Sequence, residues 1–187
     1  MEEAIPTPAP EGRRARQRRQ LLADIEAAAR HLLDEGGAAG VSMRAIARAV
    51  GVGPASLYTY FDGIDDVLTM LLLASYERLA EATATAAARF SHSPPADRAL
   101  AAVLAYRRWA LDHGNEFNLI FTDQLPGYAA PEGGSTVDAQ VAVFRPLTEA
   151  VSELAGTGAL EDTDERRAGV WAAFHGFVIL EVNHHLV

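Results

Sequence analysis

The sequence of 187 residues contains no cysteine, no lysine and no apolar run long enough to cross a membrane. Without cysteine, the chain can form neither a disulfide framework nor a thiolate metal site, and it has no cysteine nucleophile. A spanning helix needs roughly 18 apolar residues, and the longest candidate, 171–180, is interrupted by His175 and Gly176. The first residues lack the apolar core of a secretory signal. We therefore expect a cytoplasmic protein with no membrane partner.

Charge is present in both signs but is unevenly distributed. The formal net charge is −9, which for the chain as a whole argues against a nucleic-acid partner. Residues 12–61 nevertheless hold eight arginines against four acidic residues, whereas residues 62–187 hold eight against eighteen. The N-terminal third is thus locally basic. The hydrophobic content of 49% is ample for a folded core and excludes global disorder.

Helical periodicity dominates the chain, and no alternating strand pattern is longer than four residues. The spacing of Ile25, Ala29 and Leu32 predicts a first helix that stops at the glycines 36–37. A long helix is expected over 64–89, with two aspartates in its first turn. Further helices are expected at about 96–113, 115–124, 137–155 and 163–187, with a loop at 125–135. The predicted fold class is therefore all-α, with about eight helices.

Residues 42–61 predict two short helices joined by a three-residue turn, which is the helix-turn-helix arrangement. Ser42 suits the N-cap of the first helix, and Pro54 suits the first turn of the second. On a helical wheel Leu57 and Phe61 point inward. The outward positions hold small or polar residues, namely Ala55, Ser56, Tyr58 and Thr59. Such a second helix can enter the DNA major groove, although an ordinary helical hairpin with surface tyrosines is the alternative.

Residues 17–77 resemble the DNA-binding domain of the TetR family of bacterial transcriptional repressors. The matching residues are Ile25, Ala28, Leu32, Gly36, Gly37, the segments 41–44 and 46–47, the segment 49–52, and the Leu-Tyr-x-Tyr-Phe ending at 57–61. The resemblance implies a three-helix domain that binds double-stranded operator DNA.

The same resemblance assigns expected roles to individual residues. It implies that Ser42 and Arg44 contact phosphates, and that the Tyr58 and Tyr60 hydroxyls do the same. The residues expected nearest the bases are Pro54, Ala55 and Ser56, and Thr59 completes the DNA-binding set. After the final phenylalanine the family has a small residue followed by Lys or Arg. Here the corresponding position is Ile64, so one phosphate contact is expected to be missing.

An arginine-rich segment precedes the first predicted helix. Residues 1–16 are expected to form a disordered arm. The arginines that could follow the DNA backbone or enter a minor groove are Arg13, Arg14, Arg16, Arg18 and Arg19. A solvated tail without a DNA contact is the alternative for each of them.

Residues 78–187 are expected to form an antiparallel helical bundle that binds an effector and dimerises. Segments 106–110, 113–117 and 119–121 resemble a recurring stretch of TetR-family effector domains, and 171–176 resembles the WHG-type C-terminal domain. Candidate residues for the pocket of an unknown apolar small-molecule effector are Met70, Leu73, Tyr76, Trp109, Phe117, Phe121, Phe144 and Phe174. For each of these residues, plain core packing is the alternative.

The last predicted helix is apolar on two faces, which indicates burial on two sides. One face should pack on the core through Trp171, Phe174, His175, Val178 and Val182. The other carries Phe177, Leu180 and His184, which we predict to contact a second subunit in a homodimer. The family dimerises through its last two helices, so we expect the natural chain to extend beyond Val187 or the second helix to be replaced.

Chemistry other than DNA binding has little support in the sequence. Glu181, His184 and His185 could supply two or three metal ligands. His175 lies on the opposite side of the helix from His184, so it cannot join them, and we expect a hydrogen-bonded structural role for it. We predict no metal, no cofactor and no catalytic residue, since no recognised catalytic spacing is present.

The favoured function is a repressor released from a palindromic operator by an effector. An enzyme and a protein-interaction bundle are the alternatives.

Overall fold

The computed structural model describes residues 12–122, 135–156, 158 and 163–185. The described residues form eight α-helices, which confirms the all-α fold class. The helices are α1 (Arg13–Gly40), α2 (Met43–Val50), α3 (Pro54–Leu57), α4 (Ile64–Ala88), α5 (Pro95–Asp112), α6 (Gly114–Phe121), α7 (Ser135–Gly156) and α8 (Asp164–Val182). The loop predicted at 125–135 lies outside the described residues up to 134.

Helix α1 buries one apolar stripe and ends in a bend. Ile25, Ala29 and Leu33 are fully buried at intervals of four residues, so Leu33 takes the inward position that the sequence pattern assigned to Leu32. Leu32 is half-buried beside it. At Gly37 the backbone leaves the helical region, with φ 62° and ψ −169°. Positive φ is accessible to glycine without a Cβ penalty, and the predicted stop at 36–37 is confirmed as this interruption.

The helix-turn-helix unit forms where the sequence places it. The Ser42 hydroxyl accepts a hydrogen bond of 3.2 Å from the backbone N–H of Ala45, which confirms the predicted N-cap. Gly51 ends α2 in the left-handed conformation, with φ 77°. Leu57 and Phe61 are 1% and 8% exposed, so they anchor the second helix in the core as expected.

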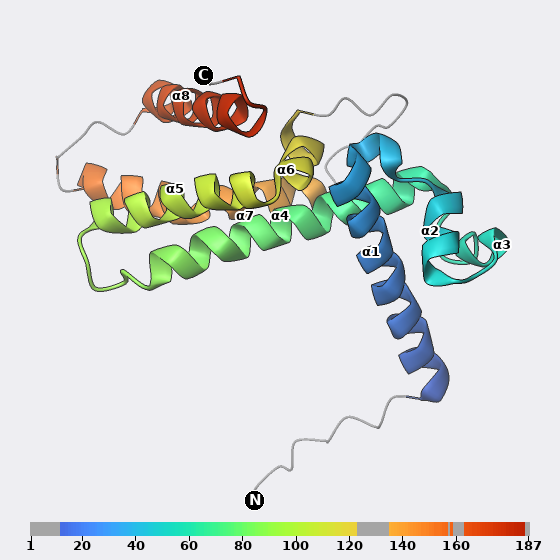
Figure 1. The fold of residues 1–187 in the computed structure, drawn as a ribbon. Helices are drawn as coiled ribbons and strands as arrows, with labels where there is room; N and C mark the ends of the chain where they lie inside the picture. The colour runs from blue at the N-terminus through green and yellow to red at the C-terminus, as the bar shows by residue number, and fades with distance from the viewer. Residues whose placement is uncertain (1–11, 123–134, 157, 159–162, 186–187) are drawn as a thin grey trace, which may run out of the picture.

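Helices α4, α5 and α7 pack against one another to form the body of the bundle, and α8 lies over α5 (Figure 1). Helix α5 runs back along α4, so its end and the short α6 return to the C-terminal half of α1 (Figure 1). Helix α8 ends at Val182, five residues before the end of the predicted 163–187 helix. The bundle thus contacts α1, which precedes the helix-turn-helix unit, through α4 and α6.

A hydrogen bond fixes α4 against α7 near a proline. Pro146 lies inside α7 and has no N–H for the carbonyl one turn earlier. Close to it in the chain, the Val143 carbonyl lies 3.2 Å from the hydroxyl of Thr83 on α4. Thr83 is 2% exposed, and its hydroxyl proton is shared with the carbonyl of Ala80 at 3.0 Å. A buried threonine therefore joins the two helices at one defined position.

Candidate functional site

The end of the molecule formed by α2 and α3 presents small and polar side chains to solvent. Helix α3 spans four residues, and the backbone bond from the Phe61 N–H to the Leu57 carbonyl (3.0 Å) extends its helical path. The exposed residues of this segment are Pro54, Ala55, Ser56, Tyr58 and Thr59. The outward face predicted from the wheel is therefore present as a protruding surface.

Two further residues of the predicted set flank this surface at the start of α2. Ser42 and Arg44 are both exposed. The Ser42 hydroxyl oxygen accepts the capping bond, which leaves its proton available to an outside acceptor. Arg44 projects from the first turn of α2, where backbone N–H groups also point outward. This arrangement offers several donors to a phosphate group.

Tyr60 differs from the other residues of the set because it is half-buried. The guanidinium carbon of Arg18 lies 5.6 Å from the centre of its ring, in a cation–π contact. The basic end of α1 is thereby tied to the helix-turn-helix unit. Sequence reasoning placed Arg18 and Tyr60 in separate segments and did not pair them.

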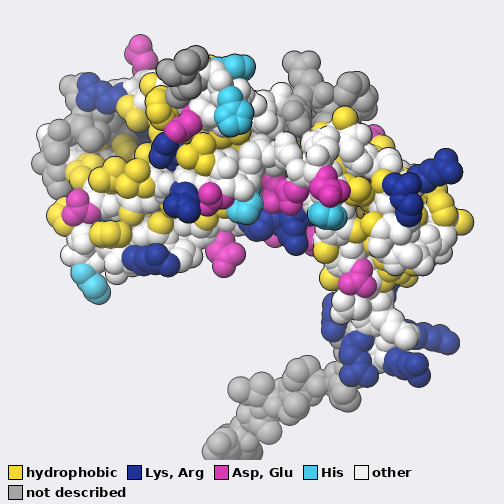
Figure 2. Space-filling view, in the orientation of Figure 1, with side chains coloured by type: hydrophobic (Ala, Val, Ile, Leu, Met, Phe, Trp, Pro, Cys, Tyr) yellow, Lys and Arg dark blue, Asp and Glu magenta, His cyan; other side chains and the backbone are white. Residues whose placement is uncertain are grey.

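The arginine-rich segment is helical from Arg13 onward, not an extended arm. Residues 13–16 were assigned to a disordered segment, and this assignment is wrong; residues 1–11 lie outside the described part of the chain. An α-helix is about 10–12 Å wide, whereas the minor groove is about 6 Å wide. In this conformation the backbone of this segment cannot lie within a minor groove, and a DNA contact would be made by the long side chains of Arg13, Arg14, Arg16, Arg18 and Arg19 alone. They surround the exposed end of α1 (Figure 2).

The start of α4 carries carboxylates where the family resemblance implies a cation. Ile64 packs against the core cluster, as expected. Asp65 and Asp66 occupy the first turn, and the Asp66 carboxylate accepts a bond of 2.6 Å from the Asp62 backbone N–H. These acids stabilise the helix N-terminus and repel phosphate.

Aromatic side chains gather inside the bundle around Tyr106. Its ring contacts the rings of Phe117, Phe121, Phe144, Trp171, Phe174 and His175 at centroid distances of 5.3–6.3 Å. Four of the predicted pocket residues, Phe117, Phe121, Phe144 and Phe174, belong to this aromatic cluster. Sequence reasoning noted the segments that contain Tyr106 and Trp171 but did not select these two residues for the site.

The other predicted pocket residues lie at the edge of the cluster or outside it. Tyr76 contacts Phe121 edge-on at 6.0 Å, and its hydroxyl donates to the Ile120 carbonyl. Met70 and Leu73 are half-buried on α4. Trp109 instead lines an open groove of about 540 Å³ between α4 and α5, where it contacts His113.

His175 is hydrogen-bonded within the aromatic cluster, as the sequence analysis expected. The Tyr106 hydroxyl lies 2.9 Å from its Nδ1 atom, and the Trp171 ring stacks on the imidazole at 4.4 Å. Burial lowers the pKa of His175 below its ordinary value. Burial also raises the pKa of Tyr106. Both groups are therefore neutral near pH 7, so the tyrosine can donate its proton to the imidazole.

Large apolar side chains are exposed along one side of α5 and α8. On α8, Val170, Phe177 and Leu180 are 59%, 48% and 42% exposed, and His184 beyond its end is exposed too. On α5 the exposed residues are Leu100, Leu104 and Leu111. Arg107, which shares their face by spacing, forms a bidentate pair with Glu181 of α8. We define the apolar face by these six apolar residues. Figure 2 shows hydrophobic side chains exposed on the bundle part of the molecule.

The carboxylate of Glu181 is engaged by Arg107, which lowers the pKa of Glu181 chiefly through that hydrogen bond. Within the described residues no group of three potential metal ligands occurs. None of the described helices has the length and apolar character of a membrane span.

Comparison with known proteins agrees with both halves of the structure. Residues 25–70 match the model for bacterial regulatory proteins of the tetR family. Residues 99–187 match the model of a tetracyclin repressor-like C-terminal domain. Together the two matches span most of the chain. The chain belongs to the TetR family. This is a family of transcriptional regulators and not of enzymes.

Relatives of this TetR-family chain are found among mycobacterial proteins and solved structures. The HTH-type transcriptional regulator Rv1816 of Mycobacterium tuberculosis is 34% identical over 155 residues, or 82% of this chain. The chain spans 65% of the length of that relative. A protein with unknown function from Rhodococcus sp. RHA1 is 27% identical, with a TM-score of 0.74 over 89% of this chain and 84% of its own.

A more distant solved structure shares the fold. The TetR family transcriptional regulator PfmR from Thermus thermophilus is 18% identical, with a TM-score of 0.65 over 85% of this chain and 83% of its own.

Proposed function

We propose that this TetR-family chain is a sequence-specific DNA-binding transcriptional regulator. The observation that carries the proposal is the exposed surface of 54–59, which is held outward by the buried Leu57 and by Phe61. Small side chains allow close approach to base edges, and hydroxyl groups donate or accept hydrogen bonds there. The regulators among its relatives support the same function. Its place of action is the cytoplasm, where bacterial DNA is accessible.

In this function each residue of the exposed surface has one of two tasks. Pro54, Ala55 and Ser56 meet base edges in the major groove. The phosphates are contacted by the flanking set, namely Ser42, Arg44, Tyr58, Thr59 and Tyr60. Arginines at the start of α1 add attraction to the phosphate backbone, with their helix itself outside the minor groove because it is too wide to enter.

A homodimer would place two such surfaces on one operator. Two recognition segments spaced about 34–36 Å apart match successive turns of one face of DNA and a palindromic site. The second subunit would cover the apolar face, which includes Phe177 and Leu180 and lies near His184. Exposed apolar patches of this kind mark interaction sites.

The effector is an apolar small molecule that binds at the aromatic cluster. The rings around Tyr106 are chemically suited to an apolar ligand, and the Tyr106–His175 pair offers one polar contact. Trp171, His175 and Gly176 also supply the residue types of the WHG-type domain. Ligand binding that prefers a second arrangement of the helices then releases the operator, so the protein acts as a repressor.

The test is binding of the purified chain to the DNA upstream of its own gene. Fluorescence anisotropy at two salt concentrations should give tight, sequence-selective binding by two subunits per site, weakening steeply with salt. Sedimentation of the same sample gives the oligomeric state. Binding that is equally weak on scrambled DNA, by a chain that sediments as a stable dimer, would contradict regulation at this site.

A further inference from the structure

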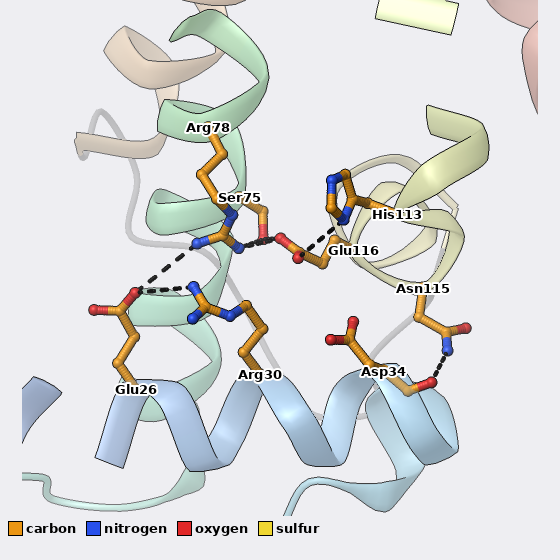
Figure 3. A network of polar contacts seen from close by, with 8 residues as sticks. All are labelled: Glu26, Arg30, Asp34, Ser75, Arg78, His113, Asn115 and Glu116. Atoms are coloured by element: carbon orange, nitrogen blue, oxygen red, sulfur yellow. Dashed lines mark hydrogen bonds and ion pairs between the residues drawn. The ribbon is translucent and has the colours of Figure 1, made fainter. Parts of the chain in front are cut away.

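A buried carboxylate lies where α4, α6 and the C-terminal half of α1 meet (Figure 3). Glu116 of α6 is 1% exposed. Its Oε2 atom accepts a hydrogen bond of 2.9 Å from the Ser75 hydroxyl and a second from the Arg78 guanidinium, both on α4. The Oε1 atom lies 3.9 Å from His113 Nδ1. A buried ionised group is tolerated because it is paired in this way.

The Arg78 guanidinium that holds Glu116 also reaches α1, which precedes the helix-turn-helix unit. Its Nη1 atom lies 3.9 Å from Glu26 of α1, and Arg30 lies at the same distance from that carboxylate. The buried Nε atom of Arg78 has no hydrogen-bond partner among the described residues, so its charge relies on the two carboxylates. In Figure 3 Arg78 stands between Glu26 and Glu116.

A second contact joins α6 to α1 directly. The Asn115 side chain donates a hydrogen bond of 2.8 Å to the Asp34 backbone carbonyl (Figure 3). Asn115 and Glu116 are neighbours in the chain, so a movement of α6 changes both contacts together.

Two phenylalanines of α6 belong to the aromatic cluster. Phe117, next to Glu116, is fully buried and contacts Tyr106 at 5.8 Å. One turn later Phe121 contacts His175 at 4.7 Å. Helix α6 has eight residues and is short enough to move as a unit. A shift of its aromatic side chains therefore shifts the carboxylate on Arg78.

We propose that Glu116 and Arg78 are positioning residues that couple the aromatic cluster to α1, the helix that packs against the helix-turn-helix unit. Separating the pair would leave a buried charge unpaired, which is strongly unfavourable, so α6 and α4 move together. The contacts of Arg78 with Glu26 and of Asn115 with the Asp34 carbonyl pass this movement to α1. This inference rests on the proposed function, because the coupling transmits effector binding to the DNA surface. The partner that carries the signal is Glu26.

Amide hydrogen exchange on the full chain tests the coupling without a known effector. Glu116→Gln keeps the shape of the side chain but removes its charge. We expect a several-fold faster exchange over residues 22–36 of α1, although the substitution is on α6. The matched control is Glu77→Gln at an exposed position of α4, which should leave α1 unchanged. Unchanged exchange in α1 of a folded Glu116→Gln chain would overturn the proposal.

The reverse experiment exploits the reciprocity of coupling. Glu26→Gln changes a partly exposed side chain of α1, so it should fold normally. We expect faster exchange in α6, residues 114–121, while Glu35→Gln on the exposed side of the same helix leaves α6 unchanged. The two α1 variants Glu26→Gln and Glu35→Gln test the coupling even if Glu116→Gln does not fold. Equal exchange of α6 in both variants would refute the coupling.

DNA binding then separates this inference from the proposed function. Against its own upstream DNA, Glu116→Gln should bind about 5-fold or more weakly than the wild type, because a loosened α1 must be ordered on binding. If the wild-type chain does not select its DNA, the proposed function fails, and the exchange data still decide the coupling. If the wild type binds and α1 exchange is unaffected, the coupling alone fails.

Discussion

The helix-turn-helix end and the bundle end of this molecule place their large side chains in opposite ways. At the first, Leu57 and Phe61 are buried and the outward surface is made of small or hydroxyl-bearing residues. At the second, the six residues of the apolar face are 40–59% exposed. Polar groups suit a DNA surface, whereas exposed apolar groups gain stability only when covered. The two ends are therefore suited to partners of different chemistry.

The comparison predicts that the same kind of truncation has unequal effects at the two ends. Tyr106→Ala removes a ring that is 3% exposed and contacts several other rings. We expect a loss of about 3–5 kcal/mol in the free energy of unfolding. Tyr58→Ala, whose side chain is 57% exposed, should change it by about 0.5 kcal/mol or less. Urea denaturation measures both, and equal losses would break the distinction.

A charge placed on the apolar face should affect assembly and not folding. Phe177→Glu puts a carboxylate into the proposed subunit contact, and we expect about 2 kcal/mol or more of lost association energy. Sedimentation at several concentrations gives the dissociation constant. Ala172→Glu is the control, because it is exposed and lies about 140° around α8 from Phe177. An unchanged constant for the phenylalanine variant would remove this face from the interface.

At the helix-turn-helix end, phosphate contacts should add affinity without selectivity. Arg44→Ala is expected to weaken binding to operator and scrambled DNA about equally and to reduce the salt slope by about 1. Tyr58→Phe should also act equally on both DNAs, with a smaller loss. Anisotropy titrations over a salt series measure both variants. Loss confined to the operator would mean that these side chains contact bases.

The smallest expected effect is a pH dependence of stability from the interior of the bundle. Burial lowers the pKa of His175, so the unfolded chain binds this proton more readily than the folded one. Well above pH 6.5 the imidazole is neutral in both states, and its contribution is constant. As the pH falls below that value, the unfolded state gains the proton first and stability decreases.

His175→Asn keeps an acceptor for Tyr106 but cannot titrate. Its free energy of unfolding should therefore fall less between pH 7.5 and 5.5 than that of the wild type. The exposed His92→Asn should retain the wild-type slope. If the free energy of unfolding of the His175 variant changes with pH as steeply as that of the wild type, the imidazole does not contribute to the pH dependence of stability.

The sequence predicted those features that depend on local spacing. The inward positions of Leu57 and Phe61, the capping role of Ser42 and the break at 36–37 follow from helical periodicity and turn chemistry, and the structure confirms them. The exposed stripe of Leu100, Leu104 and Leu111 has the same local period and could have been found in this way.

Features made by distant pairs could not be predicted from spacing. Glu116 lies 41 residues from Ser75 and 38 from Arg78, and the pattern of α6 does not indicate its partners. The assignment of residues 13–16 to a disordered segment failed for a local reason. Arginine is a good helix former, and a helix that begins near residue 20 can extend through arginines despite their mutual repulsion.

The hydrogen bond from the Thr83 hydroxyl to the Val143 carbonyl restricts how α7 can move against α4. This buried hydrogen bond lies five residues before the end of α4 and in the first half of α7, so sliding of α7 along α4 would break it. Pro146 lies less than one turn further along α7, where the missing backbone bond makes bending easier. If α7 bends, we therefore expect the bend to occur beside its contact with Thr83.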